Sequence, residues 1–377
     1  MRTGFSLSLV LVSGLLLSGC EAGSLTAVPE AMSSATPGNQ SVESGPVADV
    51  NIGLQACQEY TYVGGDDWQV AYELLIEDMC SQMAWDETLM DLRVGPDIRD
   101  DPFDFYVDGV LFQLNYLNSI AEGGIDVVPL VVVNEFDKDF FQENLEELVA
   151  IDFEWYSLSD AGGHCGYRYE AEGYCNNIYI PNETVNKNSV LTLFLGTEEV
   201  LRGHDTWRAS IPAHSATHAV QYQKKMTHYT PWAIEGQALL HELVYQQLVE
   251  GRTVRFSKYF DMALKNDPLV LDPSSEQSIR SHIIECRKDG GQCLEFSSLA
   301  GSIYFEKLIL DFGVQSYRDY FSKIWAATEL EYSWEEFELQ YAPQIFSDVY
   351  GLELESWLDE VGIPYLSTLL SADEGQS

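Results

Sequence analysis

The spacing of apolar residues predicts both helices and strands in the first half of the chain. From Asp67 to Met83 apolar residues recur at helical spacing, and further helices are expected over 110–120 and 140–149. The β-branched run from Ile125 to Val133 predicts a buried strand, although Pro129 removes one backbone donor from it. Further short strands are expected over 153–156, 167–170, 177–180 and 189–195.

The second half of the chain is predicted to be mainly helical. The expected helices cover 211–225, 231–251, 297–312, 317–326, 334–341 and 354–361. Pro231 stands at the start of the second of these helices, where its missing N–H costs no hydrogen bond. Strands followed by helices predict an α+β fold, with a small mixed β-sheet lobe followed by a mainly helical lobe.

The N-terminus has the features of an export signal. Arg2 precedes an apolar stretch from Phe5 to Leu17 that is too short to span a bilayer as a stable helix. Leu17-Ser-Gly-Cys20 resembles the lipobox of bacterial lipoproteins, which implies cleavage before Cys20 and acylation of that cysteine. An ordinary secretory signal with an incidental cysteine is the alternative. Because Glu21 follows the cysteine, the resemblance implies the outer membrane as the destination.

Composition divides the exported chain into a tether and a globular part. After a signal peptide at 1–19, residues 20–52 are rich in Ser, Ala, Gly, Pro and Glu and lack apolar periodicity, which predicts a disordered tether. The globular domain is expected over 53–366, with a C-terminal tail over 367–377. No other stretch is long and apolar enough to cross a bilayer, so we expect membrane contact through lipid on Cys20.

The remaining cysteines indicate disulfide bonds. Apart from Cys20 the chain has an even number of them, which is typical of disulfides in an exported protein. They are Cys57, Cys80, Cys165, Cys175, Cys286 and Cys293. Pairing each cysteine with its neighbour in sequence gives Cys57–Cys80, Cys165–Cys175 and Cys286–Cys293, although other connectivities are open. A cysteine zinc site is the alternative, but no C-x-x-C pair supports it.

The acidic excess excludes one class of partner. The chain has 60 acidic and 20 basic residues and a formal net charge of −40. Such a surface repels nucleic acid, and we interpret the charge as an adaptation for solubility. With 46% hydrophobic and 12% aromatic residues, the chain still holds enough apolar material for one large domain with two lobes, or for two domains.

Two histidines and a glutamate in the second half have the spacing of a metal site. His214 and His218 are four residues apart, so in a helix both imidazoles lie on one face and can reach the same ion. Glu235 follows on the next expected helix and completes a set of two histidines and one carboxylate, a known ligand set for Zn²⁺. Two helical histidines alone would be equally typical of surface or core residues.

The sequence around these residues resembles a family of zinc enzymes. The stretch from Ile211 to Gln221, followed by Pro231-Trp-Ala-Ile-Glu-Gly-Gln-Ala238, resembles the gluzincin metallopeptidases and within them the peptidase-MA-like group. The resemblance implies a zincin-like fold and assigns His214, His218 and Glu235 as the Zn²⁺ ligands.

Later segments extend the resemblance and add further candidates. The stretches Tyr304–Gly313 and Val349–Trp357 resemble the family's later helix and closing segment. By this match Tyr304 is a candidate oxyanion donor, with core packing as the alternative. Glu242 lies two helical turns after Glu235 and could orient a ligand from behind, although a solvated carboxylate is equally expected. His228 and His241 lie off the family pattern, and we expect structural or exposed positions for both.

Ser215 is the main departure from the family. It stands where the family has the glutamate that takes a proton from zinc-bound water. A positioned acid–base group contributes about 10²–10⁴-fold to the rate, and a serine hydroxyl cannot accept that proton near neutral pH. Ser215 is also excluded as a nucleophile, because both neighbouring histidines are committed to the metal. Glu198, Glu199 and Asp205 lie upstream, but the sequence does not place a carboxylate in the site.

Three functions follow from this departure. The first is a zinc-binding pseudopeptidase on an exported lipoprotein, impaired in catalysis at Ser215, that binds a peptide or protein partner. The second is an active zinc peptidase with a displaced general base. The third is a purely structural scaffold in which His214, His218 and Glu235 have no metal role.

Overall fold

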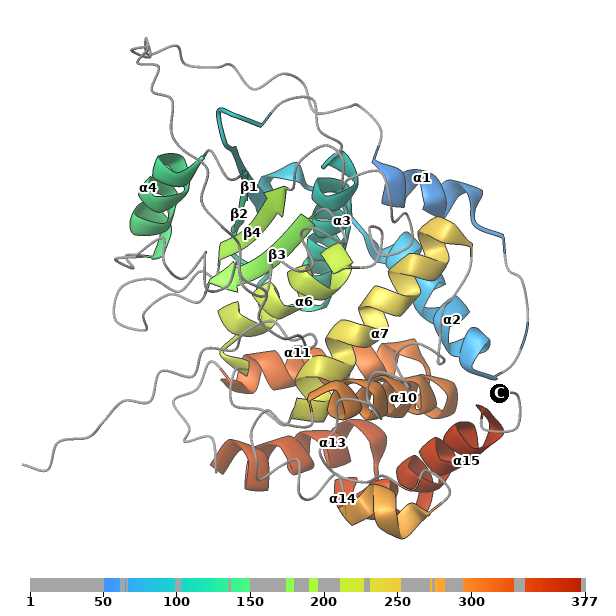
Figure 1. Cartoon of the computed structure of the whole chain (residues 1–377). Helices are drawn as coiled ribbons and strands as arrows, with labels where there is room; N and C mark the ends of the chain where they lie inside the picture. Colours follow the sequence, from blue (N-terminus) through green and yellow to red (C-terminus); the bar gives the residue numbers. More distant parts are fainter. Residues whose placement is uncertain are drawn as a thin grey trace, which may run out of the picture.

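A computed structural model defines the architecture of the chain. It describes residues 51–61, 65, 67–98, 103–134, 137–149, 174–179, 190–195, 211–226, 231–251, 272, 275–281, 294–328 and 336–373. Within these residues, a small sheet with its flanking helices lies on one side of a larger group of helices (Figure 1). The predicted α+β fold is confirmed at this level.

The sheet is mixed and has four strands in the order β1-β2-β4-β3. Strands β1 (Met90–Val94), β2 (Val128–Val133) and β4 (Val190–Leu195) are parallel, and β3 (Tyr174–Tyr179) is antiparallel to β4. Three predicted strands therefore have counterparts, whereas β1 was not predicted. The strands expected over 153–156 and 167–170 lie outside the described residues.

Pro129 is tolerated in the buried strand β2 because of its register. It pairs with Asp91 of β1, and the ladder between β2 and β4 begins one residue later, at Leu130. The missing N–H therefore lies near the first residue of the strand, before the pairing with β4 begins.

The helices around the sheet connect parallel strands and cover them. A single-turn 3₁₀ helix, η1 (Glu87–Leu89), leads into β1, and α3 (Asp104–Ile120) forms the crossover from β1 to β2. Helix α4 (Lys138–Val149) packs against β2 and β4, and α6 (Ile211–Gln223) packs against β3, β4 and α3. The sheet thereby supports the helix that carries both candidate histidine ligands.

The N-terminal helices are joined by a disulfide bond. Helix α1 (Ile52–Glu59), which was not predicted, begins after Asn51, whose side chain accepts a hydrogen bond from the Leu54 amide. Its Cys57 is bonded to Cys80 of α2 (Asp67–Gln82), which confirms the first predicted pair. Cys165, Cys286 and Cys293 lie outside the described residues, as does the side chain of Cys175, so the other two pairs remain predictions.

The helical part is built around α7 (Pro231–Glu250) and α10 (Leu294–Phe312), which pack closely together. Two glycines allow this contact: a Cβ added to Gly301 would lie 1.8 Å from the Trp232 carbonyl oxygen, and one on Gly236 would lie 2.5 Å from the Gly301 Cα. The Glu235-Gly236 pair thus combines a candidate ligand with the small residue that lets its helix approach α10.

After α10, the described residues form a series of helices that follow one another. They are α11 (Val314–Thr328), η3 (Phe337–Tyr341), α13 (Ala342–Tyr350), α14 (Leu354–Trp357), η4 (Leu358–Gly362) and α15 (Ile363–Asp373). Both η3 and η4 are π-helical turns, and each is followed after one residue by a proline, Pro343 or Pro364. A proline clashes with the carbonyl four residues earlier, and a widened turn relieves that clash. The helices expected over 334–341 and 354–361 therefore continue through these prolines.

The expected domain boundary at 366 falls inside α15. This helix runs to Asp373, and Leu370 is buried. Leu366, Leu369 and Leu370 have helical spacing, so this part of the expected tail belongs to the packed domain. No helix among the described residues is long and apolar enough to cross a membrane.

Candidate metal centre

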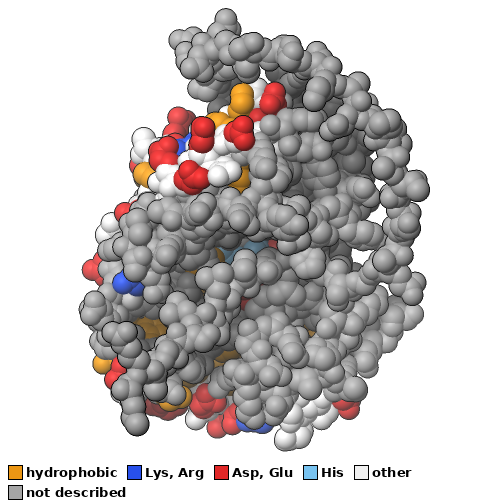
Figure 2. Space-filling model, turned by 60° about the vertical axis from the view of Figure 1, so that its left-hand side comes forward, with side chains coloured by type: hydrophobic (Ala, Val, Ile, Leu, Met, Phe, Trp, Pro, Cys, Tyr) orange, Lys and Arg blue, Asp and Glu red, His pale blue; other side chains and the backbone are white. Residues whose placement is uncertain are grey.

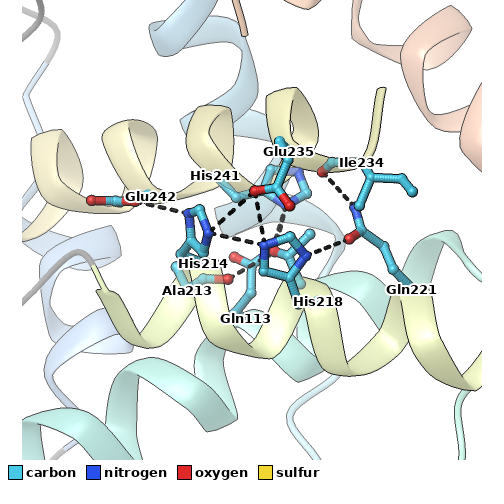
Figure 3. Close-up of polar contacts among 10 residues, drawn as sticks. Gln113, Ala213, His214, His218, Gln221, Ile234, Glu235, His241 and Glu242 are labelled. Carbon is cyan, nitrogen blue, oxygen red and sulfur yellow. Dashed lines mark hydrogen bonds and ion pairs between the residues drawn. The ribbon is translucent and has the colours of Figure 1, made fainter. Parts of the chain in front are cut away.

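Helix α6 presents His214 and His218 one turn apart on the same face. Their rings lie edge to face, with centroids 4.6 Å apart, and their Nε2 atoms are 3.0 Å apart (Figure 3). His214 is the more accessible of the two, with 27% of its side chain exposed against 12% for His218. In Figure 2 a histidine side chain is visible from outside, in a recess of the face shown. The pair is thus partly accessible rather than fully buried.

Helix α7 supplies the third candidate ligand from the opposite side. The Glu235 Oε2 atom lies 3.3 Å from His218 Nε2 and 4.0 Å from His214 Nε2. The three candidate ligand atoms all lie within 4.8 Å of one another. The structure thus brings together the three residues predicted as ligands, from two consecutive helices.

Each histidine has a different oxygen atom close behind its Nδ1. His214 Nδ1 lies 2.9 Å from Glu242 Oε2, and His218 Nδ1 lies 2.8 Å from Gln221 Oε1. Glu242 therefore occupies the orienting position expected for it, whereas Gln221 was not singled out from the sequence. Its signal was its position one helical turn after His218.

The Gln221 amide is itself fixed in orientation. Its Nε2 atom donates to the Ile234 carbonyl and to Gln237 Oε1, each over 2.9 Å, so its oxygen is left to face His218. The Gln221 oxygen accepts the Nδ1 proton of His218, so the Nε2 lone pair of that ring is directed toward the other ligands. The Glu242 carboxylate lies against Nδ1 of His214 at ion-pair distance, without hydrogen-bond geometry.

The donor geometry fits Zn²⁺. A tetrahedral zinc ion with bonds of about 2.1 Å holds its donor atoms about 3.4 Å apart. The separations of 3.0, 3.3 and 4.0 Å among the three donors bracket that distance. Two neutral imidazoles and one carboxylate are also a ligand set that zinc uses in catalytic sites.

Without metal, the same atoms attract a proton. Burial disfavours the charged form of His218, but Glu235 outweighs burial and raises the pKa of this imidazole above its ordinary value. Burial favours the neutral form of Glu235 and by itself would raise the pKa of its carboxyl. The neighbouring histidines outweigh this effect and hold that pKa below its ordinary value. A metal ion bound here must therefore displace a proton shared between these groups.

Ser215 follows His214 directly on α6 and is only 2% exposed. Glu242 does not replace the missing base, because it lies against Nδ1 of His214, on the ring edge opposite the converging Nε2 atoms. Glu198, Glu199 and Asp205 lie outside the described residues. Neither α6 nor α7 therefore positions a general base beside the converging Nε2 atoms.

Tyr304 lies in the aromatic core of the helical part. Its ring meets Trp232 edge to face at 5.8 Å and Trp357 at 6.0 Å, and the residue is fully buried on α10. These contacts give Tyr304 a packing role, and oxyanion donation by its hydroxyl remains a prediction.

Another tyrosine, which we did not predict, lies closer to the ligands. Tyr222 follows His218 by one helical turn, and the two ring centroids are 6.4 Å apart. Burial, and then the charge of Glu235, raises the pKa of Tyr222 to about 12. Its hydroxyl therefore stays protonated at physiological pH, as a hydrogen-bond donor beside the centre.

Of the other histidines, His241 is fully buried and structural, in agreement with expectation. His228 lies outside the described residues. Comparisons of the chain with known protein families, with curated protein sequences and with solved structures find no match. The interpretation of the centre therefore rests on its own geometry and on the motif that carries it.

Proposed function

We propose that this protein binds Zn²⁺ through His214, His218 and Glu235, in a domain of the zincin-like, gluzincin type. The observation that carries the proposal is the arrangement behind the two imidazoles. Glu242 and Gln221 lie against the two Nδ1 atoms, and both Nε2 atoms face the Glu235 carboxylate. Three deprotonated donors that converge on one point are what a zinc site requires.

The site favours binding over hydrolysis. When bound by these three residues, zinc would supply a Lewis acid to an oxygen atom of a ligand. Ser215 cannot remove a proton from water there, and its hydroxyl is buried. Tyr222 is a donor and not a base at physiological pH, since the pKa of its phenol is raised to about 12. We therefore propose a pseudopeptidase that uses the metal centre to hold a peptide or protein partner.

We also propose that this domain lies outside the cytoplasm. The lipobox-like Leu17–Cys20 supports an exported lipoprotein anchored at the outer membrane through Cys20. The disulfide between Cys57 and Cys80 supports the same compartment, because such bonds persist in oxidising surroundings.

Metal content tests the zinc proposal. The full chain, purified and dialysed against trace zinc, is expected to retain about one ion per molecule, as a site with three protein ligands should. His214→Ala should lose the ion, and Gln223→Ala, on the same helix but outside the ligand set, should keep it. A wild-type protein without bound zinc would overturn the proposal.

Peptidase assays on the zinc-loaded protein test the second part. We expect negligible cleavage of casein and of fluorogenic peptides by the wild type, and measurable cleavage by Ser215→Glu, which restores a general base. Robust zinc-dependent cleavage by the wild type would replace the pseudopeptidase with an active peptidase that uses a displaced base.

A further inference from the structure

A second polar cluster lies behind the metal centre, around His241 of α7. Its Nδ1 atom lies 2.8 Å from Gln113 Nε2 of α3 and 3.0 Å from Thr217 Oγ1 of α6, and its Nε2 atom lies 2.9 Å from the Tyr317 hydroxyl of α11. We call these four residues the His241 cluster. All of them are buried, and they join four helices, α3, α6, α7 and α11.

His241 is neutral and cannot serve as a metal ligand. The Gln113 amide donates to Nδ1, so the ring proton is on Nε2 and is donated to Tyr317. Burial, and then the neighbouring His214, lowers the pKa of His241 to about 3. Both ring nitrogens are therefore occupied by protein groups, and the function of the cluster must be positional.

The His241 cluster borders the metal centre on both helices that form it. On α6, Thr217 lies between His214 and His218, and its hydroxyl donates to the Ala213 carbonyl over 2.7 Å. On α7, His241 immediately precedes Glu242, the residue behind His214. The His241 ring thus contacts α6 between the two candidate ligand histidines, and His241 is adjacent in sequence to Glu242, which lies behind His214.

Burial alone does not require a polar cluster at this position. Replacing both partners of a buried hydrogen bond by apolar groups of similar shape can be nearly neutral for stability. Directional contacts instead select one register between packed helices, a role attested for some buried polar groups. Metal sites need such selection, because ligands must be held within about 0.5 Å of their working geometry.

We propose that His241 is a positioning residue for the metal centre, which sets the separation and register of α6 and α7. Through Gln113, whose amide donates both to His241 and to Thr217 of α6, it holds the two histidines opposite Glu235, and through the backbone it places Glu242 behind His214. This inference rests on the proposed zinc site. It adds that zinc affinity depends on residues of α3 and α11 that touch neither the ion nor its ligands.

Two variants of the full chain test the inference. Tyr317→Phe removes one hydrogen bond to His241 and keeps the ring contacts with Phe305 and Phe321. His241→Gln disturbs the contacts with α6 directly. We expect zinc affinity, measured by competition with a chelator, to fall about threefold in the first variant and about tenfold in the second. The visible absorption spectrum of the Co²⁺-loaded protein should shift in both, because it reports ligand geometry.

Tyr116→Phe is the matched control. It also removes a buried tyrosine hydroxyl, which donates to Asp78 over 2.9 Å, and it keeps the edge-to-face contact of this ring with His241 and all hydrogen bonds of the His241 cluster. It should lower the melting temperature of the metal-free protein to a similar extent, with zinc affinity and the Co²⁺ spectrum unchanged.

The outcomes separate the two proposals. A wild type that binds no zinc overturns the zinc site itself. A wild type that binds zinc, with unchanged affinity and spectrum in Tyr317→Phe, overturns only the role of His241, even if His241→Gln does not fold. An equal loss of affinity in Tyr116→Phe also overturns that role, because it would show general loosening of the core.

Discussion

The two histidines of the proposed metal centre have groups of different charge behind them. His214 faces the Glu242 carboxylate, whereas His218 faces a Gln221 amide that is locked by two hydrogen bonds of its own. A carboxylate behind a ligand histidine orients the ring and raises its basicity toward the metal. At the scale of residues, Glu242 should therefore contribute to zinc affinity through charge as well as position.

Glu242→Gln separates these two contributions. The amide keeps an acceptor for His214 Nδ1 but removes the charge, and we expect zinc affinity to fall about tenfold. Competition with a chromophoric chelator at pH 7.5 measures the change. Glu250→Gln, two turns further along α7, is the control and should bind zinc like the wild type. Equal affinity in Glu242→Gln and the wild type would show that position alone matters.

Among the elements, the contact between α7 and α10 has the least tolerance for change. An added methyl group on Gly301 would meet the backbone of α7 rather than a flexible side chain. Backbone atoms cannot move aside without shifting the whole helix, and α7 carries Glu235, Glu242 and His241. The packing of α10 therefore supports the position of the metal centre.

Gly301→Ala should lower the free energy of unfolding by at least about 2 kcal/mol, through overpacking of this contact. Gly362→Ala is the comparison, because its added Cβ would meet the Trp357 ring at 3.1 Å, a side chain that can adjust. Urea unfolding of both variants measures the difference. A loss in Gly301→Ala no larger than that in Gly362→Ala would contradict this account.

At the scale of the whole molecule, two buried groups limit stability from opposite sides of the pH range. Burial, only partly offset by the Ile52 amide, raises the pKa of Asp108 to about 6, so its ionisation opposes folding increasingly as the pH rises through 4 to 6. Burial, and then His214, lowers the pKa of His241 to about 3. Below about pH 6.5 the unfolded chain binds a proton that folded His241 does not, so stability falls as the pH decreases.

Asp108→Asn should therefore stabilise the protein at neutral pH and much less in acid. The amide oxygen can still accept from the Ile52 amide, and the cost of burying a charge is removed. We expect a gain of about 1–2 kcal/mol in the free energy of unfolding at pH 7.5, below the limit set by the pKa change. The gain should shrink at pH 4. Denaturant unfolding at both pH values checks this, and an equal gain at both would show that charge burial is not the cause.

Much of the fold and of the ligand set could be predicted from the sequence. Helices α6 and α7 begin where the apolar spacing and Pro231 indicate, because local signals define helix starts. The Cys57–Cys80 pair follows from proximity in sequence. Strand β1 and helix α13 were missed. Strand β1 is short and only half-buried, so its apolar pattern is weak. Pro343 normally indicates the end of a helix, but here the helix continues after a π-helical turn.

The sequence by itself determined that His214 and His218 share a helix face and that Glu235 follows on the next helix. These are relations between residues close in sequence, and helical geometry alone decides them. Only the tertiary structure decided that Gln237 fixes the Gln221 amide and that Glu242 lies against Nδ1 of His214 rather than near the Nε2 atoms. It alone also decided that His241 joins α3, α6, α7 and α11. Those relations depend on the register between packed helices. Residues far from the candidate ligands in sequence, such as Gly301 and Tyr317, contribute to that register, and no local sequence pattern predicts it.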